Sequence, residues 1–431
     1  MSRLEEMEDN ISHRRLNINV KEVVEQKAAL ASLRSECNLL RERRNSIAGS
    51  LKDASLADDA RKSLVTEGSA LKKQLASLES REKSLTEEMN LHLSLLPNFS
   101  HPSAPKTEAK LLSLEGSQPF EGGLPSWWKD HQQFGVEQGL LDFATASAVS
   151  GGKFVYLRGM AAKLEQALIA WSSAKLSQWG FELVYPPELV QSEFLQACGF
   201  QVRDASSHVY KMQGSPETCL IGTSEISLAA TFYKKTLTSA ELPLRLAGVS
   251  HCFRQEAGGR GAANKGLYRL HQFSKVEMFI VCTPEQETAE FERLIAIQTD
   301  LYRSLGLHFR IVDMPLHDLG HPAARKIDME AWMLSRNDYG EISSTSMVTD
   351  YQARRLQTRL RLPSGLLTYP HFLNGTAAAI PRLLLCILEQ YQQPDGTLDI
   401  PEVLLPYMPT ESLADADSPF QEPPPLTFSL L

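Results

Sequence analysis

The chain has 431 residues, of which 42% are hydrophobic and 22% are charged, and its formal net charge is -8. This length accommodates two or three domains with a large buried core. The acidic balance excludes binding to nucleic acid through overall positive charge, so any RNA contact must depend on local basic patches. No apolar run approaches the roughly 20 residues needed to cross a bilayer, and no membrane partner is expected.

The six cysteines are scattered and none forms a CxxC pair. This spacing predicts reduced thiols rather than a disulfide framework or a structural zinc site. The first ten residues, MSRLEEMEDN, are acidic, which is typical of neither a secretory signal nor an arginine-rich transit peptide.

The first hundred residues form a distinct region, because residues 21–96 contain no proline and carry leucines at heptad spacing. The clearest run is Leu64, Leu71, Leu78 and Leu85. The pattern predicts two packed helices joined by a turn at 52–59 and ended by Pro97. Each helix would be about 45 Å long. A dimerising coiled coil explains the same periodicity.

The remainder of the chain alternates helix and strand signals. Residues 98–150 are rich in proline, glycine and serine and predict a linker. Helices are predicted at 159–180, 285–305 and 381–392. A short strand is predicted at the start of 181–190, where Pro186 and Pro187 stop it, and further strands are predicted at 244–254, 269–283 and 308–313. The proline-rich end from residue 410 predicts disorder.

Residues 251–279 predict two antiparallel strands joined by a long glycine-rich loop. Period-two alternation places several polar residues and one ring on one face of the return strand. They are Arg269, His271, Phe273, Lys275 and Glu277. Such a face suits a planar base, a phosphate and an ammonium group. A solvent-exposed ladder of ion pairs is the alternative.

Five segments in order resemble those of class II aminoacyl-tRNA synthetases of the seryl family. Residues 253–277 (FRQEAG…GLYRLHQFSKVE) resemble motif 2, and 374–392 (NGTAAAIPRLLLCILEQYQ) resemble motif 3. Residues 221–228 (IGTSEISL) resemble the serine-binding segment, and 339–355 (YGEISSTSMVTDYQARR) the strand for metal and ATP. Residues 184–190 (VYPPELV) resemble motif 1. Together with the helical region, the resemblance covers nearly the whole chain.

The resemblance implies an α+β protein. An antiparallel helical hairpin serves as a tRNA-binding arm, and the class II core is built on an antiparallel sheet with flanking helices. The implied divisions are an arm at 1–105, a linker and start of the core at 106–150, a catalytic domain at 151–409 and a disordered tail at 410–431. The implied activity is activation of L-serine with ATP to seryl-adenylate, followed by transfer to the 3′ end of serine tRNA, in a homodimer.

The resemblance also implies two adjoining binding sites. The residues implied to bind serine are Thr223, Ser224, Glu225, Glu277 and Thr376. The residues implied to bind ATP are Arg254, Gln255, Glu256, Arg269, Phe273, Glu341, Ile342, Ser343, Ser344 and Arg382. Among these, the implied catalytic residues are Arg254 and Arg382, since negative charge develops on the phosphoryl oxygens. The implied Mg²⁺ ligands are Glu341 and Ser344, which offer the oxygen atoms that a hard cation prefers.

Three further expectations remain open. The arm arginines Arg41, Arg43 and Arg44 are candidates for tRNA phosphates, although a solvated helix surface explains them equally. Met347 replaces the asparagine usual in the family, and we expect reduced activity from it. The segments 305–315 and 325–333 resemble mitochondrial-type members, so the mitochondrial matrix is expected ahead of the cytoplasm.

A catalytically silent relative is a less favoured alternative, because the implied catalytic residues are present. A coiled-coil scaffold is disfavoured by the mixed α/β region.

Overall fold

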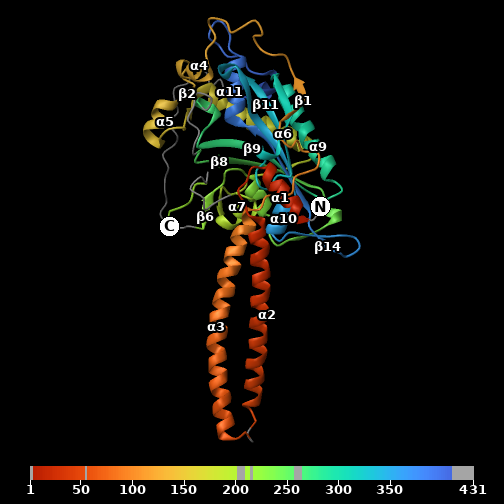
Figure 1. Ribbon diagram of the computed structural model, residues 1–431. Coiled ribbons are helices and arrows are strands. Elements are labelled where there is room, and N and C mark those ends of the chain that lie inside the picture. The colour runs from red at the N-terminus through yellow and green to blue at the C-terminus, as the bar shows by residue number, and fades with distance from the viewer. Residues whose placement is uncertain (1–2, 54–55, 201–208, 214–216, 257–264, 410–431) are drawn as a thin grey trace, which may run out of the picture.

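The computed structural model describes residues 3–53, 56–200, 209–213, 217–256 and 265–409. Figure 1 shows two parts, a compact core and a long helical hairpin that projects from it. The predicted tail and most of the predicted glycine-rich loop lie outside the described residues. No helix in the described part of the chain is long and apolar enough to span a membrane.

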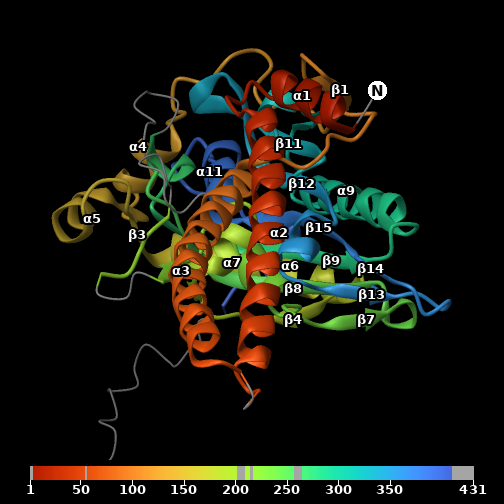
Figure 2. The same ribbon diagram turned by 60° about the horizontal axis from the view of Figure 1, so that its bottom comes forward.

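The hairpin consists of α2 (Val20–Ser50) and α3 (Asp58–Leu95), which lie side by side in Figures 1 and 2. Asn19 caps α2 by accepting a hydrogen bond from the Glu22 amide at 3.4 Å. Leu96, before Pro97, is extended, as the residue before a proline prefers. The predicted antiparallel helical hairpin is confirmed.

The first helix, α1 (Arg3–His13), joins the base of the arm to the core. Arg14 follows it and donates to the carbonyl oxygens of Gly320 at 3.1 Å and Ala323 at 2.7 Å. Burial lowers the pKa of Arg14 to about 10. Asn98, just after the arm, donates to the carbonyl of Val348 at 2.8 Å. Both ends of the arm are therefore tied to the core by buried hydrogen bonds.

The core is built on a sheet of eight strands, all antiparallel to their neighbours except that β4 runs parallel to β8. In sheet order the strands are β1 (Lys110–Glu115), β10 (Phe309–Asp313), β11 (Arg325–Met333), β12 (Asp338–Thr349), β15 (His371–Ala379), β9 (Gln272–Cys282), β8 (Leu244–Phe253) and β4 (Glu182–Val184). The predicted class II type of core, an antiparallel sheet with flanking helices, is confirmed.

Smaller strands surround this sheet. They are β2 (Leu141–Asp142) with β3 (Tyr156–Leu157), β5 (Leu189–Gln191) with β6 (Thr218–Leu220), and β7 (Thr236–Thr238) with β13 (Arg359–Arg361) and β14 (Leu367–Thr368). Short 3₁₀ helices are η1 (Ser239–Glu241), η3 (Gly266–Tyr268), η4 (Leu316–Asp318), η5 (Leu334–Arg336) and η6 (Glu402–Tyr407).

Two hydrophobic cores cover the two faces of the large sheet. The first includes residues of α6 (Gly159–Gln178), α9 (Glu287–Ser304) and α11 (Ile380–Gln390). The second includes residues of α7 (Ser192–Ala197), α8 (Glu225–Ala230) and α10 (Tyr351–Arg355). Along β9, Met278 belongs to the first core and Phe279 to the second. By alternation, Lys275 and Glu277 share the face of Phe279.

Part of the predicted linker belongs to the core. It contains β1 at the edge of the sheet, α4 (His131–Glu137) and α5 (Phe143–Ser150). Asp130 caps α4 by accepting from the Gln132 and Gln133 amides at 2.9 and 2.8 Å. Proline, glycine and serine in this segment therefore mark short connections between elements rather than an unstructured link.

Candidate active site

A buried polar cluster lies on the α8 face of the sheet. Thr376 of β15 is the register partner of Glu277 of β9, and its hydroxyl donates to Glu277 Oε2 at 3.3 Å. Lys275 Nζ donates to Thr223 Oγ1 at 2.8 Å and forms an ion pair with Glu277. All four side chains are buried. The pairing of β9 with β15 thus brings together three residues that the sequence implied for serine binding.

The sequence predicts the correct strand face for Lys275 but indicates no role for it there. Its ammonium group bridges the Thr223 hydroxyl and the Glu277 carboxylate, which are the acceptors that a substrate ammonium would also use. A buried carboxylate needs such a partner to stay ionised. The spacing 273, 275, 277 was the available signal for it.

Glu225, the first residue of α8, lies beside this cluster. Its Oε1 accepts a hydrogen bond from Gln352 Nε2 at 2.6 Å. Burial, together with the nearby Glu277 charge, raises the pKa of Glu225 to about 7. The neighbouring Ser224 is different, because its hydroxyl donates to the Gly248 carbonyl at 3.3 Å. Glu225 can therefore meet a cation, whereas the Ser224 side chain braces α8 against β8.

A pocket adjoins the cluster and includes Thr376 in its lining. Arg254 lies on one side, with its guanidinium 5.3 Å from the centre of the Phe273 ring. Arg254 Nε also donates to the Gly222 carbonyl at 3.2 Å. The pocket thus combines an aromatic ring with a fixed positive charge, the combination that a nucleotide base and its phosphates require.

Arg382 also lines this pocket, from the first turn of α11 after Pro381. Its Nη1 donates to the Glu341 carbonyl at 2.7 Å, and its guanidinium lies 4.6 Å from the centre of the Tyr268 ring. Burial would raise the pKa of Glu341, but Arg382 and Lys326 outweigh it and the pKa is lowered. Glu341 therefore presents an ionised carboxylate near the pocket.

Glu256 and Arg269 also line this pocket and form an ion pair with each other. Glu256 has a positive φ of 46°, in the left-handed region that non-glycine residues rarely adopt. The two residues flank the predicted glycine-rich loop. Their pairing therefore joins the described residues on either side of that loop within the lining of the pocket.

Among the residues implied for ATP, Ile342 and Ser343 line the pocket and also make contacts within the sheet, whereas Gln255 and Ser344 are not in its lining. Ile342 lies in the first hydrophobic core, and the Ser343 hydroxyl donates to the Thr376 carbonyl at 2.7 Å. Gln255 is exposed and Ser344 is the register partner of Asp328. A β-bulge between β11 and β12 near these residues changes which side chains face the core. Ile342 and Ser343 therefore stabilise the sheet and also line the pocket, and their contact with ATP stays a prediction.

Met347 also packs into the first hydrophobic core and is 2% exposed. It lies two and four residues after Thr345 and Ser343, whose hydroxyl groups hydrogen-bond with Gln298 of α9. The methionine side chain therefore lies on the face of the sheet opposite the serine cluster. The effect of Met347 on activity stays a prediction.

Oxygen ligands suited to a divalent cation occur near Glu341. Ser344 and Asp328 lie opposite each other on β12 and β11, and Asp328 Oδ1 is buried with no hydrogen-bond partner among the described residues. Burial raises the pKa of Asp328 to about 7, despite the opposing charge of Lys326. This donor set is of the type that Mg²⁺ prefers.

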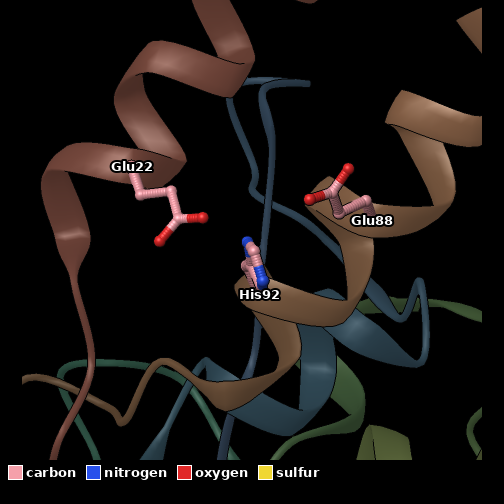
Figure 3. A group of neighbouring side chains, drawn as sticks. All are labelled: Glu22, Glu88 and His92. Atoms are coloured by element: carbon pink, nitrogen blue, oxygen red, sulfur yellow. The ribbon is translucent and has the colours of Figure 1, made fainter.

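A second group of possible metal ligands lies in the arm, where Figure 3 shows Glu22 of α2 near Glu88 and His92 of α3. Their ligand atoms lie within 4.8 Å of one another, but both carboxylates are exposed. His92 Nδ1 hydrogen-bonds with Gln26 Oε1 at 3.0 Å. Such solvated contacts are common between packed helices, and we assign no metal to this group.

The predicted tRNA-contacting arginines lie on the exposed surface of α2. Arg41 pairs with Glu79 at 2.9 Å and Arg43 with Glu67 at 2.8 Å, both across the hairpin. Within the described residues Arg44 makes no ion pair, and its Nη2 donates to Asn45 Oδ1 at 3.5 Å. Arg44 is therefore the candidate with the least competition for its charge.

A larger cavity of about 750 Å³ lies at the base of the arm, between α3, α7 and α10. Its lining includes Arg354 and Arg355 but none of the residues implied for serine or ATP. Arg354 pairs with Asp350 at 3.0 Å, and Arg355 lies 3.4 Å from the centre of the Tyr351 ring. The smaller pocket beside the serine cluster remains the candidate active site.

Comparisons with known proteins agree with this geometry. Residues 209–391 match the family model of the tRNA synthetase class II core domain (G, H, P, S and T), and residues 2–100 match that of the seryl-tRNA synthetase N-terminal domain. A serine–tRNA ligase of Treponema denticola is 40% identical over 94% of this chain and 96% of its own length. Another, of Dictyoglomus thermophilum, is 39% identical over 93% of this chain and 95% of its own length.

Solved structures give the same result. Seryl-tRNA synthetase of Pyrococcus horikoshii complexed with ATP aligns with a TM-score of 0.79 and 33% identity, covering 90% of this chain and 92% of that one. Cytoplasmic serine–tRNA ligase of Naegleria fowleri in complex with AMP aligns with a TM-score of 0.78 and 27% identity, covering 94% of each chain.

The fold and the motif 2 and motif 3 elements define a class II aminoacyl-tRNA synthetase. Within that class, the near full-length identity and the matching N-terminal domain show that the chain belongs to the seryl-tRNA synthetase family. Its activity is the ATP-dependent ligation of serine to serine tRNA.

Proposed function

We propose that the cluster of Thr223, Glu225, Glu277 and Thr376 binds L-serine, and that Arg254 and Arg382 bind and activate ATP beside it. The observation that supports this proposal is that Thr376 belongs to both sites. Thr376 hydrogen-bonds with Glu277 in the cluster and also lines the pocket that contains both arginines. A serine bound at the cluster would thus have its carboxylate directed toward the α-phosphate of ATP.

The proposed chemistry uses no side-chain nucleophile. The serine carboxylate attacks the α-phosphorus of ATP, and pyrophosphate leaves to give seryl-adenylate. The 3′-terminal ribose hydroxyl of tRNA then attacks the adenylate carbonyl, and AMP leaves. Arg254 and Arg382 lie on different elements lining one pocket, so their charges can stabilise the phosphoryl oxygens during the first step.

The same cluster supports selection of serine over similar amino acids. The Glu277 carboxylate and the Thr376 hydroxyl are buried and can bond to the substrate hydroxyl. Alanine would leave buried polar groups without a partner, which a site of this kind rejects strongly. Threonine would have to be excluded by its extra methyl group.

Mg²⁺ is the proposed metal ion, and Glu341 and Ser344 would hold it. The oxygen atoms of these residues fit a hard cation, as does the nearby Asp328 Oδ1, which has no hydrogen-bond partner in the part of the chain that the structure describes. When bound, the ion would neutralise charge on the phosphates of ATP. Arg382 orients the Glu341 segment through its hydrogen bond to the backbone carbonyl.

The helical arm is the proposed binding site for the body of serine tRNA. Its length and its exposed arginines support contact with phosphates along the RNA rather than with anticodon bases. Arg41, Arg43 and Arg44 are the proposed contacts. Arg41 and Arg43 would have to exchange their ion pairs with Glu79 and Glu67 for phosphate.

A homodimer is the proposed assembly, through the edge of the sheet at β4. Leu183, Tyr185 and Leu189 near this edge are 40%, 71% and 47% exposed, an apolar surface that a second copy would cover. Sedimentation of the chain and of Tyr185→Asp tests this. A dimer that the substitution dissociates is expected, and a monomeric native chain would contradict it.

The mitochondrial matrix is the proposed compartment, ahead of the cytoplasm. Its support is the resemblance of the segments 305–315 and 325–333 to mitochondrial-type members. Imaging of the tagged full-length protein tests it. Diffuse cytoplasmic signal would contradict it.

The deciding experiment is ATP–pyrophosphate exchange with serine, and with alanine, threonine and glycine as controls. We expect exchange with serine only, and a loss on the order of 100- to 1,000-fold in Arg254→Ala. Exchange with no amino acid, in a folded protein, would contradict the proposed site and favour a silent binding protein.

A further inference from the structure

A buried His–Glu pair connects three distant segments behind the ATP pocket. His131 is the first residue of α4, and its Nδ1 lies 2.7 Å from Oε1 of Glu389, near the end of α11. The side chains are only 6% and 1% exposed. Glu389 also accepts from the backbone amides of His131 at 3.4 Å and Ser335 at 3.0 Å. One carboxylate thus joins α4, α11 and η5.

The other side of the His131 ring reaches the end of the predicted glycine-rich loop. Because a backbone amide only donates, Nε2 is the acceptor of the ring, and Nδ1 carries the hydrogen that faces Glu389. The Leu267 amide donates to Nε2 at 3.3 Å. Gly266 also packs against the ring, because a Cβ atom added at this position would lie only 2.1 Å from Nε2. The φ angle of Gly266 is +58°. This approach requires glycine at position 266.

The segments fixed by the pair carry part of the ATP pocket. Tyr268 follows Leu267, and its ring lies 4.6 Å from the Arg382 guanidinium and 4.4 Å from that of Arg336. Arg382 Nε also donates to the Tyr268 carbonyl at 3.4 Å. Arg336 adjoins Ser335, the residue held by Glu389. The pair therefore holds both segments whose side chains stack at Tyr268.

We propose that His131 and Glu389 are positioning residues for ATP, which place Tyr268 and through it the Arg382 guanidinium. This inference rests on the proposed role of Arg382 toward ATP. The serine cluster is held by separate contacts among Thr223, Lys275, Glu277 and Thr376. We call the chain of contacts from Glu389 through His131 to Tyr268 the relay. Loss of the relay should therefore weaken ATP binding and leave serine binding unchanged.

Two matched substitutions separate the two sides of the ring. His131→Asn retains a donor toward Glu389 but is too short to offer an acceptor to Leu267, whereas His131→Gln can place an oxygen near the Nε2 position. We expect KM for ATP in pyrophosphate exchange to rise about tenfold in His131→Asn, as loss of one buried hydrogen bond allows. We expect a smaller rise in His131→Gln, which keeps the acceptor for the Leu267 amide but loses the donor to Glu389. KM for serine should stay constant in both.

Two more variants complete the design. Gly266→Ala should reproduce the rise in KM for ATP, because its Cβ would displace His131. Gln133→Ala on the exposed side of α4 removes only a contact to Glu137 and should change neither KM.

Titration calorimetry with ATP alone, on the full chain, separates this inference from the proposed activity. Weaker ATP binding in His131→Asn and Gly266→Ala supports the relay even if serine exchange fails. Unchanged ATP affinity in folded His131→Asn or, if that variant does not fold, in Gly266→Ala overturns it. Equal losses of ATP and serine affinity would also overturn it, because they would indicate a structural role only.

Discussion

The arm and the core use the same charged residue types to different effect. The arm pairs Arg34 with Glu82 at 2.9 Å, with side chains 53% and 22% exposed. The core pairs Lys275 with Glu277, whose side chains are 7% and 3% exposed. Water screens the first pair, so it stabilises the fold little, while removal of one partner from the second leaves a buried charge. The comparison indicates that a charged side chain of the arm can exchange its ion-pair partner at little cost. A charged side chain of the core cannot.

The sharpest way to break this comparison is Lys275→Ala. Glu277 would be buried without its cation, and we expect the free energy of unfolding to fall by about 3–5 kcal/mol. Chemical denaturation followed by circular dichroism measures it. Arg43→Ala, which breaks the exposed pair with Glu67, is the control and should leave the unfolding midpoint unchanged. Similar midpoints for the two variants would contradict the distinction.

Glu225 tests the electrostatics of the serine cluster through pH. The pKa of this buried carboxyl is raised to about 7 in the free protein, and the serine ammonium requires its ionised form. Each pH unit below 7 should therefore raise KM for serine about tenfold. Glu225→Gln should bind serine weakly at every pH. A flat wild-type profile from pH 6 to 8 would exclude Glu225 as the ammonium acceptor.

Met347→Asn distinguishes the sequence expectation from the structure. Because Met347 packs in the hydrophobic core, a buried amide there should lower the free energy of unfolding by about 1–3 kcal/mol without raising activity. Thermal unfolding and pyrophosphate exchange measure the two effects. Higher activity in Met347→Asn would instead restore the expectation that this methionine impairs the ATP pocket.

The smallest effect is expected from Arg44→Ala. Replacing this exposed arginine should weaken tRNA binding and reduce the slope of log affinity against log salt by about 1. Filter binding over a salt series measures it, with pyrophosphate exchange as the control that should not change. An unchanged salt slope would remove Arg44 from the RNA contact.

The sequence predicts the long periodic elements well and misses the short elements between residues 98 and 150. The arm helices and the helices at 159–180 and 285–305 carry enough turns for their pattern to emerge, and the structure contains α2, α3, α6 and α9 there. The strand β1 and the helices α4 and α5 are six to eight residues long and lie among prolines and glycines. Their register depends on distant partners, such as β10 for β1, which no local pattern encodes.

The candidate site shows the same limit. Motif residues such as Arg254 and Arg382 were found by resemblance, and the fold brings them to one pocket. Lys275 and the His131–Glu389 pair were given no role, because what they do depends on contacts across the fold. His131 and Glu389 are 258 positions apart in the chain.

The most direct test of the division between arm and core is a chain in which residues 24–91 are replaced by a short flexible linker. The buried anchors at Arg14 and Asn98 remain in this variant, so the core should stay folded. Pyrophosphate exchange and charging of serine tRNA are then measured in parallel. We predict exchange close to that of the full chain with charging lost. Loss of exchange in a folded variant, or full retention of charging, would contradict the account.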